Sequence, residues 1–90
     1  MAKYPCPCCG FLTLDEKPPG TYYICPVCFW EDDRVQFDDP DYRGGANRGS
    51  LREARENYRR IGAIDENSLR HVRAPLADEV PPSSKVGSDE

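Results

Sequence analysis

The sequence has 90 residues, of which 38% are hydrophobic and 31% are charged. A chain of this size rarely stabilises a fold by more than roughly 3–5 kcal/mol unless a metal or disulfides assist its core. The net charge is −4, whereas a nucleic-acid-binding domain normally presents a dominant basic face, so we expect no nucleic-acid partner. No apolar run reaches the roughly 20 residues of a membrane helix, and the first residues form no apolar secretion signal, which predicts a cytosolic protein without a membrane partner.

Two short β-prone runs, residues 11–14 and 21–24, lie among turn residues in the first third of the chain. The segment that joins them ends in Pro19-Gly20, which suits the central positions of a type II turn. We therefore expect these two runs to pair as an antiparallel hairpin. Residues 31–49 contain Pro40 and three glycines without a sustained hydrophobic period, which predicts a long loop.

The clearest helix signal follows that loop. Ser50 and Glu53 form a capping box, in which Ser50 is the N-cap and Glu53 reaches back to the Ser50 amide. Gly62 supplies the C-terminal stop of this helix. Its apolar residues recur on one face, which should pack on the rest of the domain: Leu51, Ala54, Tyr58 and Ile61.

A second, shorter helix is predicted over residues 66–72, with Asp65 as its N-cap. It should turn two apolar residues inward, Leu69 and Val72. From residue 74 onward, prolines, serines and acidic residues dominate, which is typical of disorder. We therefore expect one domain over residues 1–75 and a disordered acidic tail over residues 76–90.

All five cysteines lie before residue 29, and four of them form two C-x2-C pairs separated by fifteen residues. Two residues between ligands let a tight turn aim both sulfurs at one ion, and this separation falls in the range of four-cysteine zinc sites. The predicted ligands of one zinc ion per chain are Cys6, Cys9, Cys25 and Cys28. Iron in the same sulfur cage is an alternative, since tetrahedral sulfur ligands suit either metal, and buried or disulfide-bonded cysteines are a further one.

Each C-x2-C pair should lie in a turn whose backbone amides point at the first sulfur. Gly10 ends the first turn and can adopt a positive φ, whereas Phe29 occupies the matching position of the second turn. A left-handed phenylalanine is strained by about 1–2 kcal/mol, so we expect the second turn to be less regular. Cys8 remains as a free thiol that points away from the ion, with a thiol-redox role or exchange with Cys9 as alternatives.

The charges are unevenly distributed along the chain. Residues 31–42 carry six acids against one arginine, and residues 43–60 carry six arginines against two glutamates. The acids either pair with these arginines while Trp30 covers the metal turn, or stay exposed as a docking surface for a basic protein partner. A carboxylate pair that catalyses hydrolysis is a third interpretation. The candidate partner-binding residues are Trp30, Asp32, Asp33, Asp38 and Asp41.

Several separated strings resemble the cysteine-rich CPCC family over roughly residues 3–75. They are Tyr4-Pro-Cys-Pro-Cys-Cys-Gly10, Cys25-Pro-Val-Cys-Phe-Trp-Glu-Asp-Asp33, Asp39-Pro-Asp-Tyr42, Gly44-Gly-Ala-Asn47 and Ser50-Leu-Arg-Glu-Ala-Arg-Glu-Asn57. The resemblance implies a small, mostly bacterial, zinc-ribbon-like domain and no established activity.

The prediction from the sequence is therefore a small metal-bound α+β domain, with zinc-ribbon or rubredoxin-like β-hairpins followed by one or two helices. We expect it to be a non-enzymatic protein-interaction module. The first alternative is an electron-transfer or thiol-redox protein that uses iron or Cys8. The second is a hydrolase-type enzyme that uses carboxylates of the acidic loop.

Overall fold

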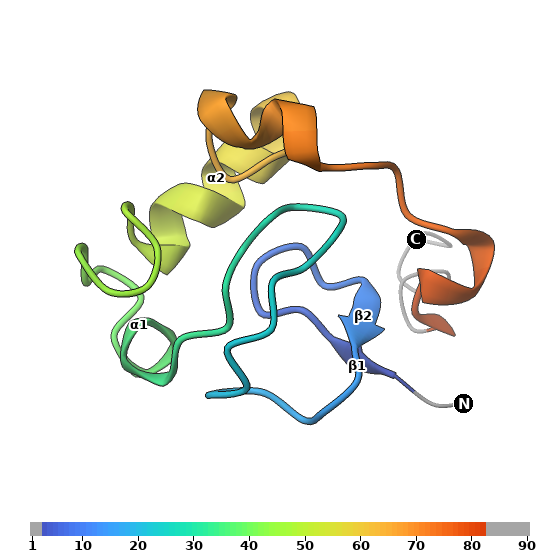
Figure 1. Ribbon diagram of the computed structural model, residues 1–90, viewed down its shortest axis with the longest axis horizontal. Coiled ribbons are helices and arrows are strands. Elements are labelled where there is room, and N and C mark those ends of the chain that lie inside the picture. The colour runs from blue at the N-terminus through green and yellow to red at the C-terminus, as the bar shows by residue number, and fades with distance from the viewer. Residues whose placement is uncertain (1–2, 83–90) are drawn as a thin grey trace, which may run out of the picture.

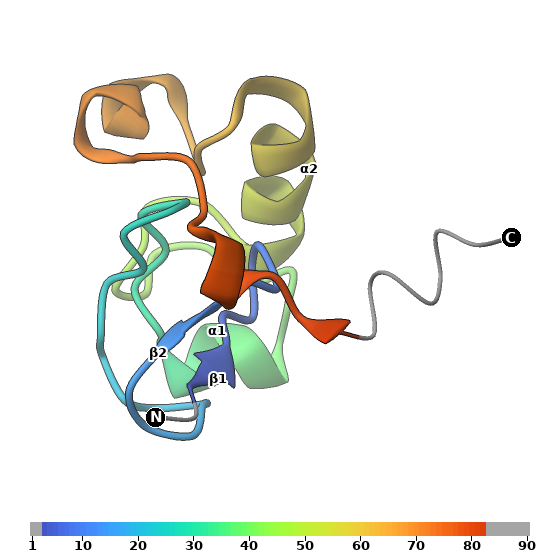
Figure 2. The same ribbon diagram turned by 90° about the vertical axis from the view of Figure 1, so that its right-hand side faces the viewer.

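The computed structural model describes residues 3–82. Its elements are β1 (Tyr4–Pro5), β2 (Leu12–Leu14), α1 (Arg34–Asp38), α2 (Leu51–Ile61) and two 3₁₀ helices, η1 (Glu66–His71) and η2 (Ala77–Glu79). Figure 1 shows α2 and the orange η1 above the hairpin and α1, and Figure 2 shows the same two levels after a quarter turn. The result is a small α+β fold. None of the helices in the described part of the chain is long and apolar enough to cross a membrane.

The hairpin differs from the predicted one. β2 pairs antiparallel with β1, on the other side of the first cysteine turn, and the predicted pairing of residues 11–14 with 21–24 is wrong. The segment 21–24 instead runs beside the residues after the second cysteine turn, where Ile24 forms a bridge with Glu31. Each C-x2-C turn reverses the chain, so each closes its own short hairpin with the residues that flank it.

The predicted loop over residues 31–49 contains the short helix α1. Asp33 caps this helix, because its side chain accepts hydrogen bonds from the amides of Val35 at 2.8 Å and Gln36 at 3.4 Å. The fully buried Gln36 side chain then donates to three carbonyl oxygens of the following loop, those of Tyr42, Asn47 and Gly49, at 2.9–3.2 Å. A polar network around one glutamine therefore orders the loop.

The predicted capping box of α2 is confirmed. The Ser50 side chain accepts from the Glu53 amide at 3.1 Å, and the Glu53 carboxylate accepts from the Ser50 amide at 2.9 Å. Gly62 has a φ of 88° and ends the helix by donating to the Tyr58 carbonyl at 2.9 Å. The inner face of α2 buries Leu51 and Ala54 against the main hydrophobic core. That core lies between the helix and the two cysteine turns.

The second helix is shorter and tighter than predicted. η1 is a 3₁₀ helix, capped as expected by Asp65, whose side chain accepts from the Ser68 amide at 2.9 Å. Ser68 is buried, whereas Leu69 is 44% exposed, so the expectation that Leu69 turns inward is wrong. The period of three residues in a 3₁₀ helix places a different face inward than an α-helix would.

The chain remains packed beyond residue 75, where we expected the tail to begin. Glu79, in η2, is 7% exposed, and its carboxylate binds both terminal nitrogens of Arg73 at 2.9 Å. The Leu76 amide donates to the same carboxylate at 2.8 Å. These contacts tie residues 76–79 to the domain, and residues 83–90 of the predicted tail lie outside the described residues.

Candidate metal centre

The two cysteine turns, residues 6–10 (the first turn) and 25–29 (the second turn), have the same backbone hydrogen bond. Gly10 donates to the Cys6 carbonyl and Phe29 donates to the Cys25 carbonyl, both at 2.8 Å. Gly10 has a φ of 83° and Phe29 has a φ of 78°. Phe29 therefore adopts the left-handed conformation, as its position predicted, but the second turn is as regular as the first, and the expectation of an irregular turn is wrong.

Backbone amides point at the sulfurs of both turns, as predicted. The Cys8 amide lies 3.4 Å from the Cys6 sulfur, and the Val27 amide lies 3.4 Å from the Cys25 sulfur. The Trp30 amide lies at the same distance from the Cys28 sulfur. Such N–H to sulfur hydrogen bonds spread the negative charge of thiolates and orient them for a metal.

The turns bring together the four predicted ligands. The Sγ atoms of Cys6, Cys9, Cys25 and Cys28 all lie within 4.8 Å of one another. Two of the separations are 3.6 Å, for Cys6 and Cys28, and 3.7 Å, for Cys9 and Cys25. A zinc ion with Zn–S bonds of about 2.3 Å requires sulfur separations of about 3.8 Å in a regular tetrahedron. The sulfur positions therefore suit a tetrahedral metal ion, and this group could hold one.

Four thiols at this distance cannot all lose their protons unless a cation compensates the charge. The hydrogen bond with Cys28 is the main cause that lowers the pKa of Cys25 below its usual range. Hydrogen bonds with Cys25 are correspondingly the main cause that raises the pKa of Cys28 and of Cys9. Without a cation, the first negative charge therefore rests on Cys25 while Cys28 and Cys9 keep their protons. A divalent ion can replace those protons.

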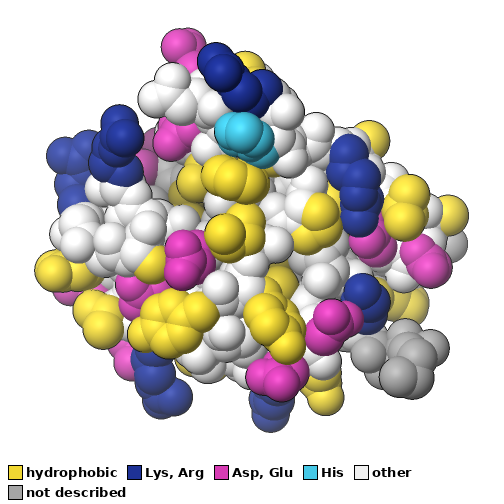
Figure 3. Space-filling view, viewed as in Figure 1, with side chains coloured by type: hydrophobic (Ala, Val, Ile, Leu, Met, Phe, Trp, Pro, Cys, Tyr) yellow, Lys and Arg dark blue, Asp and Glu magenta, His cyan; other side chains and the backbone are white. Residues whose placement is uncertain are grey.

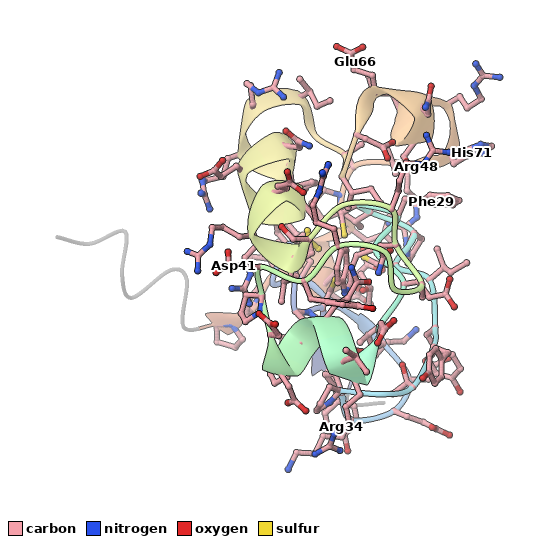
Figure 4. All side chains as sticks on the ribbon, turned by 90° about the vertical axis from the view of Figure 1, so that its left-hand side faces the viewer. Phe29, Arg34, Asp41, Arg48, Glu66 and His71 are labelled. Carbon is pink, nitrogen blue, oxygen red and sulfur yellow. The ribbon has the colours of Figure 1, made fainter. Side chains whose placement is uncertain are left out.

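The second turn is embedded in the fold. Its Cys28 carbonyl accepts from the Ile64 amide at 3.0 Å, and its Pro26 carbonyl accepts from the Arg73 amide at 3.1 Å. Between these two contacts, the ring of Phe29 stacks on His71 with centroids 4.9 Å apart, and Figure 4 shows this pair beside the second turn. The segment around η1 is therefore attached to the second turn at three points.

Two residues that support the site were not singled out from the sequence. The hydroxyl of Thr13 lies 3.1 Å from the Cys25 sulfur, and both groups are buried. The Asn47 side chain accepts from the Glu31 amide at 2.9 Å and donates to the Glu31 carbonyl at 2.8 Å, just beyond the second turn. Both contacts join residues distant in the sequence, and no local pattern could have indicated them.

Cys8 is not part of the four-sulfur group. Its side chain is partly exposed and packs beside the buried core. Its contribution to the site is the amide that faces the Cys6 sulfur. The role of its thiol stays a prediction.

The predicted docking surface is not present as expected, because Trp30, Asp32 and Asp33 are between 1% and 6% exposed. Trp30 belongs to the core beside the cysteines. Asp32 accepts from the amide of Thr21 at 2.9 Å and from its hydroxyl at 2.8 Å. Asp33 caps α1 and also accepts from the Ala46 amide at 2.7 Å. These three residues are structural, and assigning them to a docking surface was wrong.

The other two candidate residues, Asp38 and Asp41, are exposed. Asp38 lies 3.5 Å from Arg34, and Asp41 lies 2.5 Å from Arg52 in α2; Figure 4 labels Arg34 and Asp41 at the margin of the molecule. The hydrogen bond from Arg52 lowers the pKa of Asp41. Asp41 therefore pairs with the basic segment, whereas Asp38 pairs with the arginine of its own segment, so the two segments neutralise each other only in part.

A four-cysteine centre held by two chain reversals, with a capped helix packed over it, defines a small α+β domain with a candidate metal site. The sequence model of the cysteine-rich CPCC family matches residues 4–79 of the chain. The chain therefore belongs to the cysteine-rich CPCC family, and the match extends beyond the limit of about residue 75 that the resemblance indicated. No curated protein matches the chain at a significant level.

Proposed function

We propose that the chain is a cytosolic, zinc-ribbon-like module that binds one structural zinc ion and acts by contacting another protein. The observation that carries this proposal is the closed set of four sulfurs within 4.8 Å, of which those of Cys6, Cys25 and Cys28 belong to residues at most 2% exposed. Catalytic zinc sites keep one position open for water or substrate, whereas structural sites use four protein ligands. The donor set therefore supports a structural role.

The chemistry of the donors favours zinc, which is bound by thiolates in tetrahedral structural sites. Bound there, zinc would cross-link the two turns and compensate the charge of their thiolates. The same four sulfurs also suit iron, which would make the protein an electron carrier. Metal identity separates the two functions, because an iron tetrathiolate is coloured and redox-active.

The test of the site is elemental analysis of protein purified from metal-replete cells. We expect one zinc ion per chain in the wild type. Cys8→Ser should keep its full zinc content and Cys9→Ser should lose it, because Cys9 belongs to the four-sulfur group and Cys8 does not. These two neighbouring cysteines are a matched pair of variants. A dominant iron signal, or loss of metal in Cys8→Ser alone, contradicts the assignment.

The interaction role is supported by apolar side chains that the fold leaves exposed near the acidic loop. Tyr22 is 57%, Ile24 is 50% and Val35 is 55% exposed. Figure 3 shows hydrophobic side chains gathered on one face below the histidine, with acidic side chains among them. We propose this face, with the acidic side chains that lie on it, as the surface that contacts a partner with basic residues.

The interaction is tested by affinity capture from native cytosol with the metal-loaded protein. We expect a Tyr22→Ser, Ile24→Ser variant to lose a partner that the wild type captures, because these side chains contribute exposed apolar surface. Leu76→Ser is the control, since Leu76 is similarly exposed, at 54%, but belongs to a different part of the chain, at the N-cap of η2. Identical partners for all three proteins, each folded by NMR, would show that this face is not the interaction surface.

A further inference from the structure

We propose that Thr13 is a positioning residue of the metal centre, whose hydroxyl donates a hydrogen bond to the coordinated sulfur of Cys25. The inference rests on the proposed metal site. In this proposal, β2 holds Cys25, a ligand in the second turn, in place.

The backbone of β2 is shaped in a way that turns Thr13 inward. Tyr4 lies opposite Leu14 and Pro5 lies opposite Leu12, so Thr13 is an extra residue without a partner in β1. This is a β-bulge, and bulges beside functional sites redirect a side chain. In a regular strand, neighbouring side chains point to opposite faces. Here Thr13 and Leu14 are consecutive and both buried, with 8% and 1% exposure.

The redirected hydroxyl meets a sulfur from the other turn. The Thr13 Oγ1 lies 3.1 Å from the Sγ of Cys25, which is fully buried. A metal-bound thiolate has no proton to donate, so in the loaded site the hydroxyl is the donor. Because Thr13 follows the first turn and Cys25 begins the second, this hydrogen bond joins the two turns independently of the metal.

The Cys25 sulfur receives more hydrogen bonds than its partners. It accepts from the Val27 amide as well as from Thr13. Within residues 3–82, the sulfurs of Cys6 and Cys28 accept one backbone amide each. The added hydroxyl reduces the electron density that Cys25 donates to the metal and fixes the direction of its sulfur. Groups that orient ligands in this way typically change metal affinity by about 10–100-fold.

The experiment compares Thr13→Val with Thr21→Val in the full chain. Both changes replace a hydroxyl with a methyl group, but the Thr21 hydroxyl binds Asp32 at 2.8 Å and contacts none of the sulfurs. Zinc affinity is measured by competition with a chelator, and the cobalt(II)-loaded proteins report the energy of the sulfur-to-metal charge-transfer band. We expect Thr13→Val to bind zinc about 10-fold more weakly and to move the band to lower energy. Thr21→Val should leave the band unchanged, and Thr13→Ser should restore both properties.

The band separates a positioning role from a merely structural one. A Thr13→Val protein that is less stable but has the wild-type band and affinity would overturn the inference, and so would a band that shifts equally in Thr21→Val. Should Thr13→Val not fold, Thr13→Ala carries the same comparison. If the wild type itself binds neither zinc nor cobalt, the proposed metal site fails; if it binds both and Thr13→Val does not differ, only the role of Thr13 fails.

Discussion

The two cysteine turns have nearly the same backbone but different residues at the position that requires a positive φ. Gly10 occupies it in the first turn, where an added Cβ would meet no atom within 4 Å. Phe29 occupies it in the second turn and places its ring on His71. A bulky residue in this conformation is strained by about 1–2 kcal/mol. The second turn therefore dispenses with glycine at a position where the side chain gains a contact with another element.

The turns also differ in how deeply they are buried. Cys25, Val27 and Cys28 of the second turn are at most 1% exposed. In the first turn, Cys8 and Cys9 are only partly buried, and Arg55 of α2 supports the turn with a hydrogen bond to the Pro7 carbonyl at 2.9 Å. The second turn is therefore the more deeply buried and anchored half of the four-sulfur group, and the first turn is the half nearer to solvent.

The largest expected effect is that of metal removal, which tests whether the anchored turn can persist without the ion. Structural zinc contributes roughly 10–16 kcal/mol of apparent binding energy, whereas a core of this size supplies roughly 3–5 kcal/mol. We expect complete chelation to abolish the amide dispersion of the whole domain in NMR spectra, and added zinc to restore it.

The amides of Gly10 and Phe29 report the two turns separately in this experiment. We expect both to lose their protection from hydrogen exchange on chelation. If the Phe29 amide stays protected while the Gly10 amide does not, packing alone holds the second turn, and metal and fold are not coupled across the domain.

The features that the sequence predicted correctly depend on residues close together in the chain. The spacing of each C-x2-C pair identified Cys6, Cys9, Cys25 and Cys28, which the fold brings within 4.8 Å. The capping box identified the start of α2, because its hydrogen bonds span three residues. In both cases local geometry determines the structure, and tertiary packing has little freedom to change it.

The features that the sequence did not predict depend on partners far along the chain. Six acids in twelve residues indicated an exposed surface, but Asp32 is buried because Thr21 binds its carboxylate, and Asp33 because it caps α1 and binds Ala46. The β-prone runs 11–14 and 21–24 were identified, but each pairs across its own cysteine turn and not with the other run. The bulge at Thr13 had no signal in the sequence.

The smallest expected effect concerns the position of positive φ in each turn, Gly10 or Phe29, and three variants measure the backbone strain there. Gly10→Ala introduces a Cβ into open space, so its effect is that of the left-handed backbone alone, about 1–2 kcal/mol of destabilisation. Phe29→Ala keeps the strained backbone and removes a stacked pair that contributes about 0.5–1.5 kcal/mol beyond its buried area. Phe29→Gly removes the same ring but relieves the strain.

We therefore expect Phe29→Gly to be more stable than Phe29→Ala, by about the same 1–2 kcal/mol that Gly10→Ala loses. Urea unfolding at one fixed zinc concentration measures the free energy of unfolding of the three variants. Bound zinc adds the same amount to each value when the variants have the same zinc affinity. Equal stability of the two Phe29 variants would mean that the second turn bears no backbone strain. A loss in Gly10→Ala much larger than the difference between the Phe29 variants would mean that the two turns relax differently. Agreement between the two values would show that the second turn retains the same strain as any other left-handed residue.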